Sequence, residues 1–430
     1  MSTQKTITPT KRAEIAHDLQ VGIARTSIPD YQELSLVGMA SILAIHIRGL
    51  GEIEYSVLRQ VADHFFDIPA MVVDQPLKIL EEIGYVSLIT EGKTIRKVIP
   101  SVPHFESVYS GLGEYLSNQS LTEHEQLSLA ILDELSTKPE KRDTLLGRLG
   151  ADAPVFSRCE SIIGQGGLLV SKRSRGQTVL VSPAYFADNL DALADLAAAG
   201  GAGRIEKILK LIASCQGWPL TMIEQHAELN GTKLTPDEMR ILRALVADGV
   251  LKPPSIERPN RKAEHFIFTP RPGNIRLDAT SREIYERAMA LVSAVRKGQL
   301  LPERYRIRYP EAILTSLRDK KVIGANSEAA HQYRNLVSLR IGKLQKAAGD
   351  KFQFHLIDTP ENLRAIEDAL SLIRYGGTSQ IGLQNDALIA LTQDEQYIQS
   401  IVASSRFRTI EKSELQPNEK AEIEQLLLGF

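Results

Sequence analysis

The side chains with the clearest chemical potential are arginines and lysines that gather at short intervals. Three such groups occur: Lys172, Arg173 and Arg175; Arg258, Arg261 and Lys262; and Arg304, Arg306 and Arg308. The last group alternates with other residues, so an extended strand would place all three side chains on one face. Cations grouped in this way can neutralise phosphates of nucleic acid and release its counterions. A solvated charged turn is the ordinary alternative for any one of them.

A fourth basic group falls on residues 328–347, whose apolar spacing predicts a helix. Tyr333, Val337, Ile341 and Leu344 would form its buried stripe. The other faces carry Asn, Gln, Arg and Lys, which can contact base edges or phosphates in a groove. The candidate contacts here are Arg334, Asn335, Arg340, Lys343 and Lys346, joined by Lys320 and Lys321 from the preceding β-type run.

The elements that would position these groups form an internal repeat. An apolar helix ends in glycine and is followed by a β-type run, a charged turn, a second β-type run and a proline. The glycines are Gly84, Gly166 and Gly249, spaced 82 and 83 residues apart. Each copy is preceded by further helical periodicity. Thr122 with Glu125 has the spacing of a capping box at the start of one such helix.

Three helices closed by glycine and followed by a hairpin resemble the winged helix-turn-helix plan. The chain is similar to tandem winged-helix proteins over about residues 34–273, and 333–346 resembles the third helix of response-regulator winged helices. The expected fold is mainly α with small β-hairpins (α+β). The expected order is an N-terminal arm or helix (1–33), winged helices at 34–118, 119–199 and 204–273, a divergent fourth at 281–360, and a helical tail at 361–430.

The phase of the fourth copy stays open between two readings. In one, the helix at 311–318 is followed by the β-type run at 320–323. In the other, 328–347 is the third helix and 351–357 supplies the hairpin, which keeps the spacing of the closing prolines more regular.

Charge is unevenly distributed along the chain. The 430 residues are 43% hydrophobic, which argues against disorder, and their net charge is -2. This value is a cancellation, because residues 1–203 sum to -7 and residues 204–430 to +5. Acidic residues also occupy the third helices of the first and third copies. We therefore expect phosphate contacts in the second half, and a protein partner or self-association at the acidic first half.

Several kinds of chemistry lack their sequence signals. There is no phosphate-binding P-loop, no metalloprotease motif and no zinc-ligand spacing, so we expect no enzyme activity, no cofactor and no metal. Cys159 and Cys215 are placed as packing residues. The most apolar stretch, 34–47, is too short to span a bilayer. No secretory leader is apparent at the N-terminus, and a cytoplasmic location is expected.

Two hypotheses follow from these patterns. The first is a non-enzymatic protein that binds double-stranded DNA, as a regulator or as a subunit of a DNA-processing, defence, replication or partition complex. The alternative is a winged-helix scaffold that joins proteins without contacting DNA. The two differ in whether the basic groups at 172–175, 258–262, 304–308 and 334–346 share one face of the folded chain.

Overall fold

The computed structural model describes residues 7–103, 105–251, 253–258, 261–270, 279–301, 306–376 and 385–392. Within these ranges the fold is mainly helical with small antiparallel sheets, as expected. The first elements are α1 (Pro9–Ile23) and η1 (Pro29–Tyr31). Among the helices described, none combines the length and the apolar character that a bilayer crossing requires.

The first repeat has a helix, a short strand, two helices and a hairpin. Its elements are α2 (Gln32–Ile47), β1 (Ile53–Glu54), α3 (Tyr55–Phe65), α4 (Asp74–Glu82), β2 (Val86–Glu91) and β3 (Thr94–Pro100). The hairpin strand β3 is central, with β1 on one side and β2 on the other. The short strand therefore fixes the hairpin to the start of α3. Next comes α5 (Phe105–Ser117), which packs on α1 and α2.

The second and third repeats reproduce this order. The second contains α6 (Glu123–Thr137), β4 (Glu140–Lys141), α7 (Arg142–Leu149), α8 (Ala153–Gln165), β5 (Val170–Ser174) and β6 (Gln177–Val181). The third contains α10 (Ala202–Ala213), β7 (Trp218–Pro219), α11 (Leu220–His226), α12 (Pro236–Ala247), β10 (Ser255–Arg258) and β11 (Arg261–Ile267). In both sheets the last strand is again central.

Smaller elements connect and decorate these repeats. They are α9 (Leu190–Leu196) and η2 (Ala197–Gly201) before the third repeat, and the hairpin β8 (Glu228–Leu229) and β9 (Thr232–Lys233) within it. The structure contains the helix-end motifs that the sequence predicted, except that one glycine exit is shifted by one residue. Thr122 and Glu125 form the expected capping box. The left-handed exits lie at Gly84, Gly167 and Gly249, so Gly167 takes the role expected of Gly166, which is right-handed.

The fourth repeat has the same pairing with shorter helices. Its elements are α13 (Ala279–Gln299), α14 (Pro310–Lys320), β12 (Val322–Asn326), α15 (Ala329–Gln332), α16 (Arg334–Ser338), β13 (Gly342–Lys346) and β14 (Phe352–Leu356). The last strand β14 lies between β12 and β13. In this order α14 takes the position of the first helix before the first strand, and α13 packs against it, so the repeat combines parts of both phases that the sequence left open.

The predicted single helix over 328–347 is wrong. Helical structure there stops at Ser338, and 342–346 is the edge strand β13. Tertiary contacts override the helical period. The side-chain amide of Asn362 donates to the carbonyls of Arg340 at 3.1 Å and Ile341 at 3.5 Å, groups that a helix would have used internally. Gly342 also lies so close to Phe354 that a Cβ would sit 2.2 Å from its ring. Val337, expected in the buried stripe, is exposed.

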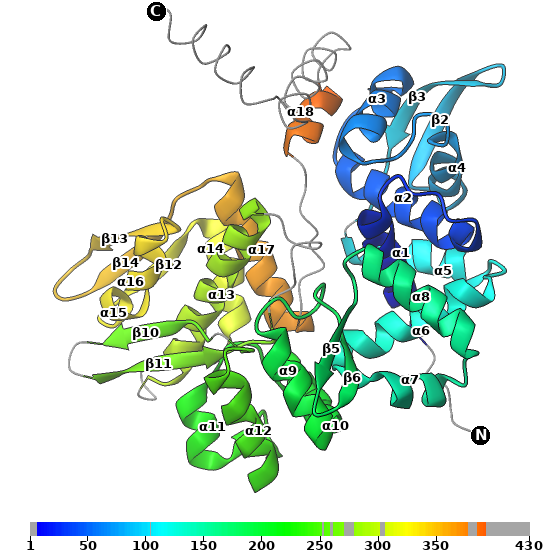
Figure 1. Cartoon of the computed structure of the whole chain (residues 1–430). Coiled ribbons are helices and arrows are strands. Elements are labelled where there is room, and N and C mark those ends of the chain that lie inside the picture. Colours follow the sequence, from blue (N-terminus) through cyan, green and yellow to red (C-terminus); the bar gives the residue numbers. More distant parts are fainter. Residues whose placement is uncertain are drawn as a thin grey trace, which may run out of the picture.

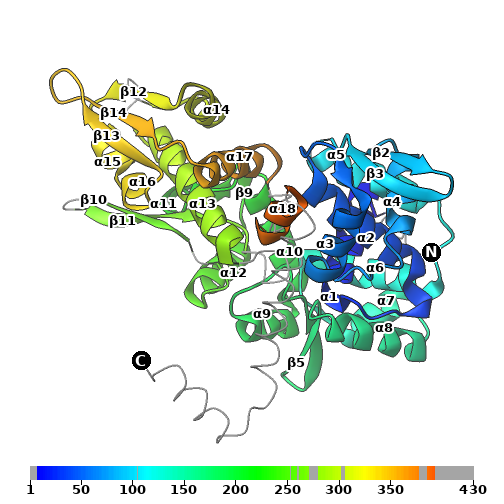
Figure 2. The same ribbon diagram turned by 90° about the horizontal axis from the view of Figure 1, so that it is seen from above.

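Two helices follow the fourth repeat. The first, α17 (Pro360–Tyr375), was placed in a C-terminal tail by the sequence, but it packs on α13 and α14 within their core. The second, α18 (Asn385–Thr392), packs on α3 and α2 of the first repeat. Figures 1 and 2 both show the first two repeats on one side of the molecule and the last two on the other.

The helix α1 fastens the first two repeats into one core. It is buried on nearly all sides between α2, α5 and the second repeat. This packing depends on small residues where backbones meet. A Cβ on Gly22 would lie 2.4 Å from the carbonyl oxygen of Gly166, and one on Gly38 would lie 2.5 Å from that of Ala16. The side chains of His17 and Tyr109 are hydrogen-bonded at 2.8 Å across the α1–α5 contact.

A buried carboxyl group on α17 makes the stability of the C-terminal core depend on pH. Asp368 is 3% exposed, and its Oδ1 has no hydrogen-bond partner in the described part of the chain. Burial raises the pKa of Asp368 to about 7, against a lowering by Arg364. The folded state thus holds this proton more tightly than the unfolded chain does. Stability is therefore highest below the unfolded pKa and falls as the pH rises towards 7.

We expect Asp368→Asn to raise the unfolding temperature of this core at pH 8 by about 4 °C, because a neutral amide replaces a buried charge. At pH 4 the wild-type carboxyl is protonated when folded, and the two proteins should unfold within about a degree of each other. Thermal denaturation followed by circular dichroism at both pH values measures this. A variant that is no more stable at pH 8 would contradict the buried ionisation.

Candidate nucleic-acid interface

Two of the three cations predicted as phosphate contacts in the second repeat form ion pairs within the chain itself. Lys172 lies on β5 and its Nζ is 3.0 Å from Oδ1 of Asp191 on α9. Arg175, in the hairpin turn with a φ of 50°, is 3.7 Å from Asp195 on the same helix. Arg173 is exposed and has no partner among the described residues. Of the three predicted phosphate contacts, only Arg173 therefore has a charge that no described carboxylate neutralises.

The third-repeat group lies at the end of a hairpin. Arg258 is the last residue of β10, Arg261 the first of β11, and the two are paired in register. Lys262 follows on β11. The side chains of all three lie outside the described part of the structure, so the backbone alone fixes their place at the hairpin tip.

Five exposed cations on α16, on β13 and in the turns beside β13 lack a salt-bridge partner among the described residues. They are Arg334, Arg340, Lys343, Lys346 and Lys351, and we call them the β13 basic group. Arg334 begins α16, Arg340 has a φ of 55° in the turn before β13, and Lys343 and Lys346 lie on β13. Lys351 lies opposite Ala347 at the hairpin turn, where the amide of Ala347 donates to the carbonyl of Lys351 at 2.8 Å, and Lys346 is paired with Phe352.

Most carboxylates of this repeat are paired with cations outside the β13 basic group. Asp319 is bound by Arg318 at 2.8 Å, and this hydrogen bond lowers the pKa of Asp319. Asp358 is bound by Lys321 at 3.1 Å, and Glu311 by Arg374 at 2.7 Å. Lys321, which the sequence predicted as a phosphate contact, is therefore already occupied by an ion pair. Because these acids are locally neutralised, the β13 basic group keeps its positive potential.

The third predicted group lies next to this surface, without the expected strand. Arg304 falls outside the described residues, whereas Arg306 and Arg308 are both exposed in a segment without regular structure. The amide of Ile307 donates to the carbonyl of Gly298 at 2.9 Å. The side chains of Ile307 and Gln332 both crowd Gly298, which places the segment beside α15. Arg306 and Arg308 therefore adjoin the start of α16.

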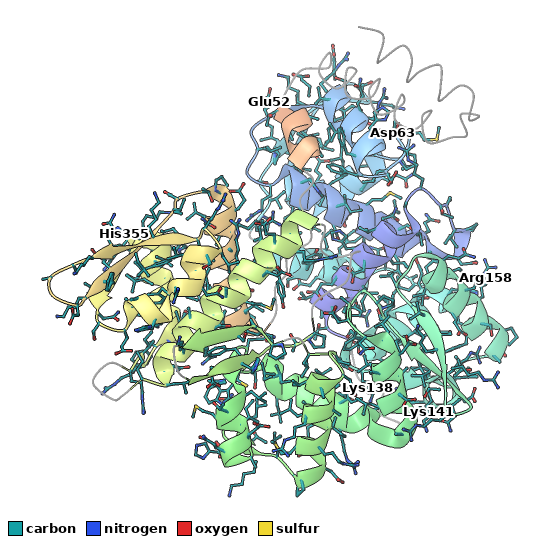
Figure 3. The ribbon with its side chains drawn as sticks, turned by 60° about the vertical axis from the view of Figure 1, so that its left-hand side comes forward. Glu52, Asp63, Lys138, Lys141, Arg158 and His355 are labelled. Atoms are coloured by element: carbon teal, nitrogen blue, oxygen red, sulfur yellow. The ribbon has the colours of Figure 1, made fainter. Side chains whose placement is uncertain are left out.

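The basic groups divide between the two sides of the molecule. Figures 1 and 2 agree that the β10–β11 hairpin lies beside α15 and α16, whereas β5 lies with the first two repeats. Figure 3 shows the same separation between His355 on the fourth sheet and Arg158 on α8. The strand ends at Arg258 and Arg261 and the groups at 306–308 and 334–351 thus lie on the same side of the molecule, and the group at 172–175 lies on the other.

The third helices of the first three repeats offer less to phosphates. Arg158 on α8 pairs with Asp30, and Arg243 on α12 pairs with Glu224 at 3.2 Å. On α12, Arg240 pairs with Asp237 at 3.4 Å. On α4 the exposed ends of Glu81 and Glu82 oppose the charge of Lys78. These contacts leave each helix close to neutral or acidic, as the sequence indicated.

Three further residues of the fourth repeat bear on the predicted interface. Lys351 was not selected from the sequence, although it falls in the stretch 296–351 that carries a net charge of +8. Asn335 was selected, but it is half-buried on the five-residue α16. Lys320, at the end of α14, is exposed and has no partner among the described residues.

Comparison with known proteins found neither a matching protein-family model nor a curated protein of matching sequence. No group of His, Cys, Asp and Glu that could hold a metal ion occurs among the described residues. A functional assignment therefore depends on the repeated topology and on where unpaired positive charge gathers.

Proposed function

We propose that the chain is a tandem array of winged-helix domains that binds double-stranded DNA through its last two repeats. The observation that carries this proposal is the β13 basic group, in which five exposed cations lack partners in the described structure. Like charges kept unpaired on one surface favour a polyanion, because each phosphate contact releases counterions. The proposed contacts are to the phosphates of the DNA backbone, so the binding affinity should depend strongly on salt concentration.

The wider arrangement supports the same proposal. In each repeat the central last strand joins the hairpin to the first strand, which is the order of a winged helix. The hairpin of the third repeat lies beside α15 and α16 in both views (Figures 1 and 2). A duplex spanning these two repeats would meet both basic groups at once. The proposed activity is binding without catalysis, as a regulator or as a subunit of a DNA-processing, defence, replication or partition complex.

Proposed location and partners follow from the first two repeats. Cys159 and Cys215 are both free and buried, which fits a reducing compartment such as the cytoplasm. The acidic first half is proposed as the side that meets a protein partner or another copy. A scaffold without DNA binding is the second candidate, favoured by the net charge of -7 over residues 1–203, which would suit a basic protein partner.

The hairpin of the third repeat supplies a test of the DNA proposal. Replacing Arg258, Arg261 and Lys262 by Ala should weaken duplex binding and lower the slope of log affinity against log salt by about one for each phosphate that is no longer neutralised. Fluorescence anisotropy with a labelled duplex at several salt concentrations measures both quantities. The scaffold alternative predicts no duplex affinity in either protein. Weakening with an unchanged slope would show that the three residues do not meet phosphates.

A further inference from the structure

Two tyrosines stand out on the surface of the C-terminal repeats. Tyr309 is 75% exposed and Tyr375 is 64% exposed. Neither ring forms a hydrogen bond within the described part of the chain. The other phenylalanine, tyrosine and tryptophan side chains whose burial the structure describes are at least half-buried, so this pair calls for an explanation beyond packing.

The two tyrosines belong to one place in the fold. Tyr309 directly precedes α14, and Tyr375 is the last residue of α17. These two helix ends are joined by an ion pair, in which Nε of Arg374 is 2.7 Å from Oε1 of Glu311. Tyr375 is the neighbour of Arg374, and Tyr309 is two residues from Glu311. Both tyrosines are therefore within two residues of the same salt bridge.

Positive charge surrounds this place. Arg308 precedes Tyr309 in the chain, and Arg306 and Arg308 are exposed without an ion pair among the described residues. Glu311 is the nearest carboxylate in sequence to Tyr309, and Arg374 neutralises it. Aromatic rings beside a basic groove form the recurring platform on which unpaired bases stack while phosphates meet the cations.

We propose that Tyr309 and Tyr375 form a stacking site for unpaired nucleobases. The preferred ligand is then duplex DNA that carries a single-stranded extension, with the duplex on the β13 basic group and the extension passing Arg306 and Arg308 to the two rings. This inference rests on the proposed function and names its substrate class more narrowly. Stacking uses the face of the ring, so the phenol hydroxyls are not required.

The test compares a blunt duplex with the same duplex extended by about six unpaired nucleotides, a length within known single-strand site sizes. We expect the full chain to bind the extended duplex about tenfold more tightly, because each stacked base contributes strongly. Tyr309→Ala with Tyr375→Ala should reduce that ratio to about twofold or less, whereas Tyr309→Phe with Tyr375→Phe should keep it. Fluorescence anisotropy gives all the affinities.

Control measurements distinguish a failure of this inference from a failure of the proposed duplex-binding function. Met71→Ala also removes an exposed apolar side chain, on the first repeat, and should keep the wild-type ratio. Equal affinities for blunt and extended duplexes in the wild type would overturn the inference, as would loss of the ratio in the Phe variant or its retention in the Ala variant. Lack of any affinity for the blunt duplex would instead count against the proposed function. Both tyrosines are exposed, so the unfolding temperature should stay unchanged.

Discussion

Reversing two charges on β13, Lys343→Glu with Lys346→Glu, is expected to weaken duplex binding about 1000-fold at low salt. Each reversal replaces an attraction to phosphate by a repulsion, and at contact distance in water each of these amounts to about 1 kcal/mol. Both lysines are exposed and unpaired among the described residues, so the effect should appear in binding and not in folding. Anisotropy titrations of a labelled duplex measure the change.

A matched variant on the first repeat makes this result specific. Lys78→Glu with Lys93→Glu changes the net charge of the chain by the same amount, also at exposed positions. We expect the affinity of this variant to fall by less than about threefold, because its charges lie on the side of the molecule away from β13 and are screened over that distance. If both pairs of substitutions weakened binding equally, overall charge rather than the β13 surface would be responsible.

Gln216→Leu is expected to destabilise the junction of the third and fourth repeats by about 3 kcal/mol. Gln216 is fully buried and connects three segments. Its Nε2 donates to Oγ1 of Thr269 and to the carbonyl of Gly376, each at 2.7 Å, and its Oε1 accepts from the amide of Thr269 at 3.0 Å. Leucine fills a similar volume but leaves these buried groups without partners, at about 1–3 kcal/mol for each group left unpaired.

Thermal unfolding and hydrogen exchange together check this expectation. The amide of Thr269 should exchange faster in the variant, since its acceptor is gone. Gln345→Leu is the matched control, because Gln345 is exposed on β13 and should change the stability by less than about 0.5 kcal/mol. A variant at Gln216 that unfolds like the wild type would mean that the junction does not depend on this amide. Gln216→Leu should weaken DNA binding only if the duplex contacts the third and fourth repeats at the same time.

How much of the fold could be predicted from the sequence differs between repeats. The first three follow local signals closely: capping at Thr122, glycine exits, and the hairpins after each third helix. Local rules suffice there because each repeat closes its own sheet. In the fourth repeat the helical period at 328–347 was overridden by Asn362, which lies about 20 residues further along and takes up the carbonyls of that segment.

The sequence predicted which region would be rich in basic residues, but not which of those residues remain unpaired in the fold. The excess of positive charge after residue 296 marked the region that holds the β13 basic group. Sequence could not show that Lys172 and Arg175 meet aspartates of α9, or that Lys321 meets Asp358, because these partners are fixed by tertiary packing. Lys351 was missed because it was read only as the start of a strand. Pairing within the fold, rather than residue type, separates the cations available to a ligand from the rest.

The most direct test of the DNA-binding proposal is the affinity of the full wild-type chain for duplex DNA as salt is varied. We expect binding at about 50 mM salt that weakens steeply, with a log–log slope of about -4.5 if the five cations of the β13 basic group each meet a phosphate. The absence of measurable affinity for any duplex at that salt concentration, or an affinity indifferent to salt, would contradict the proposal.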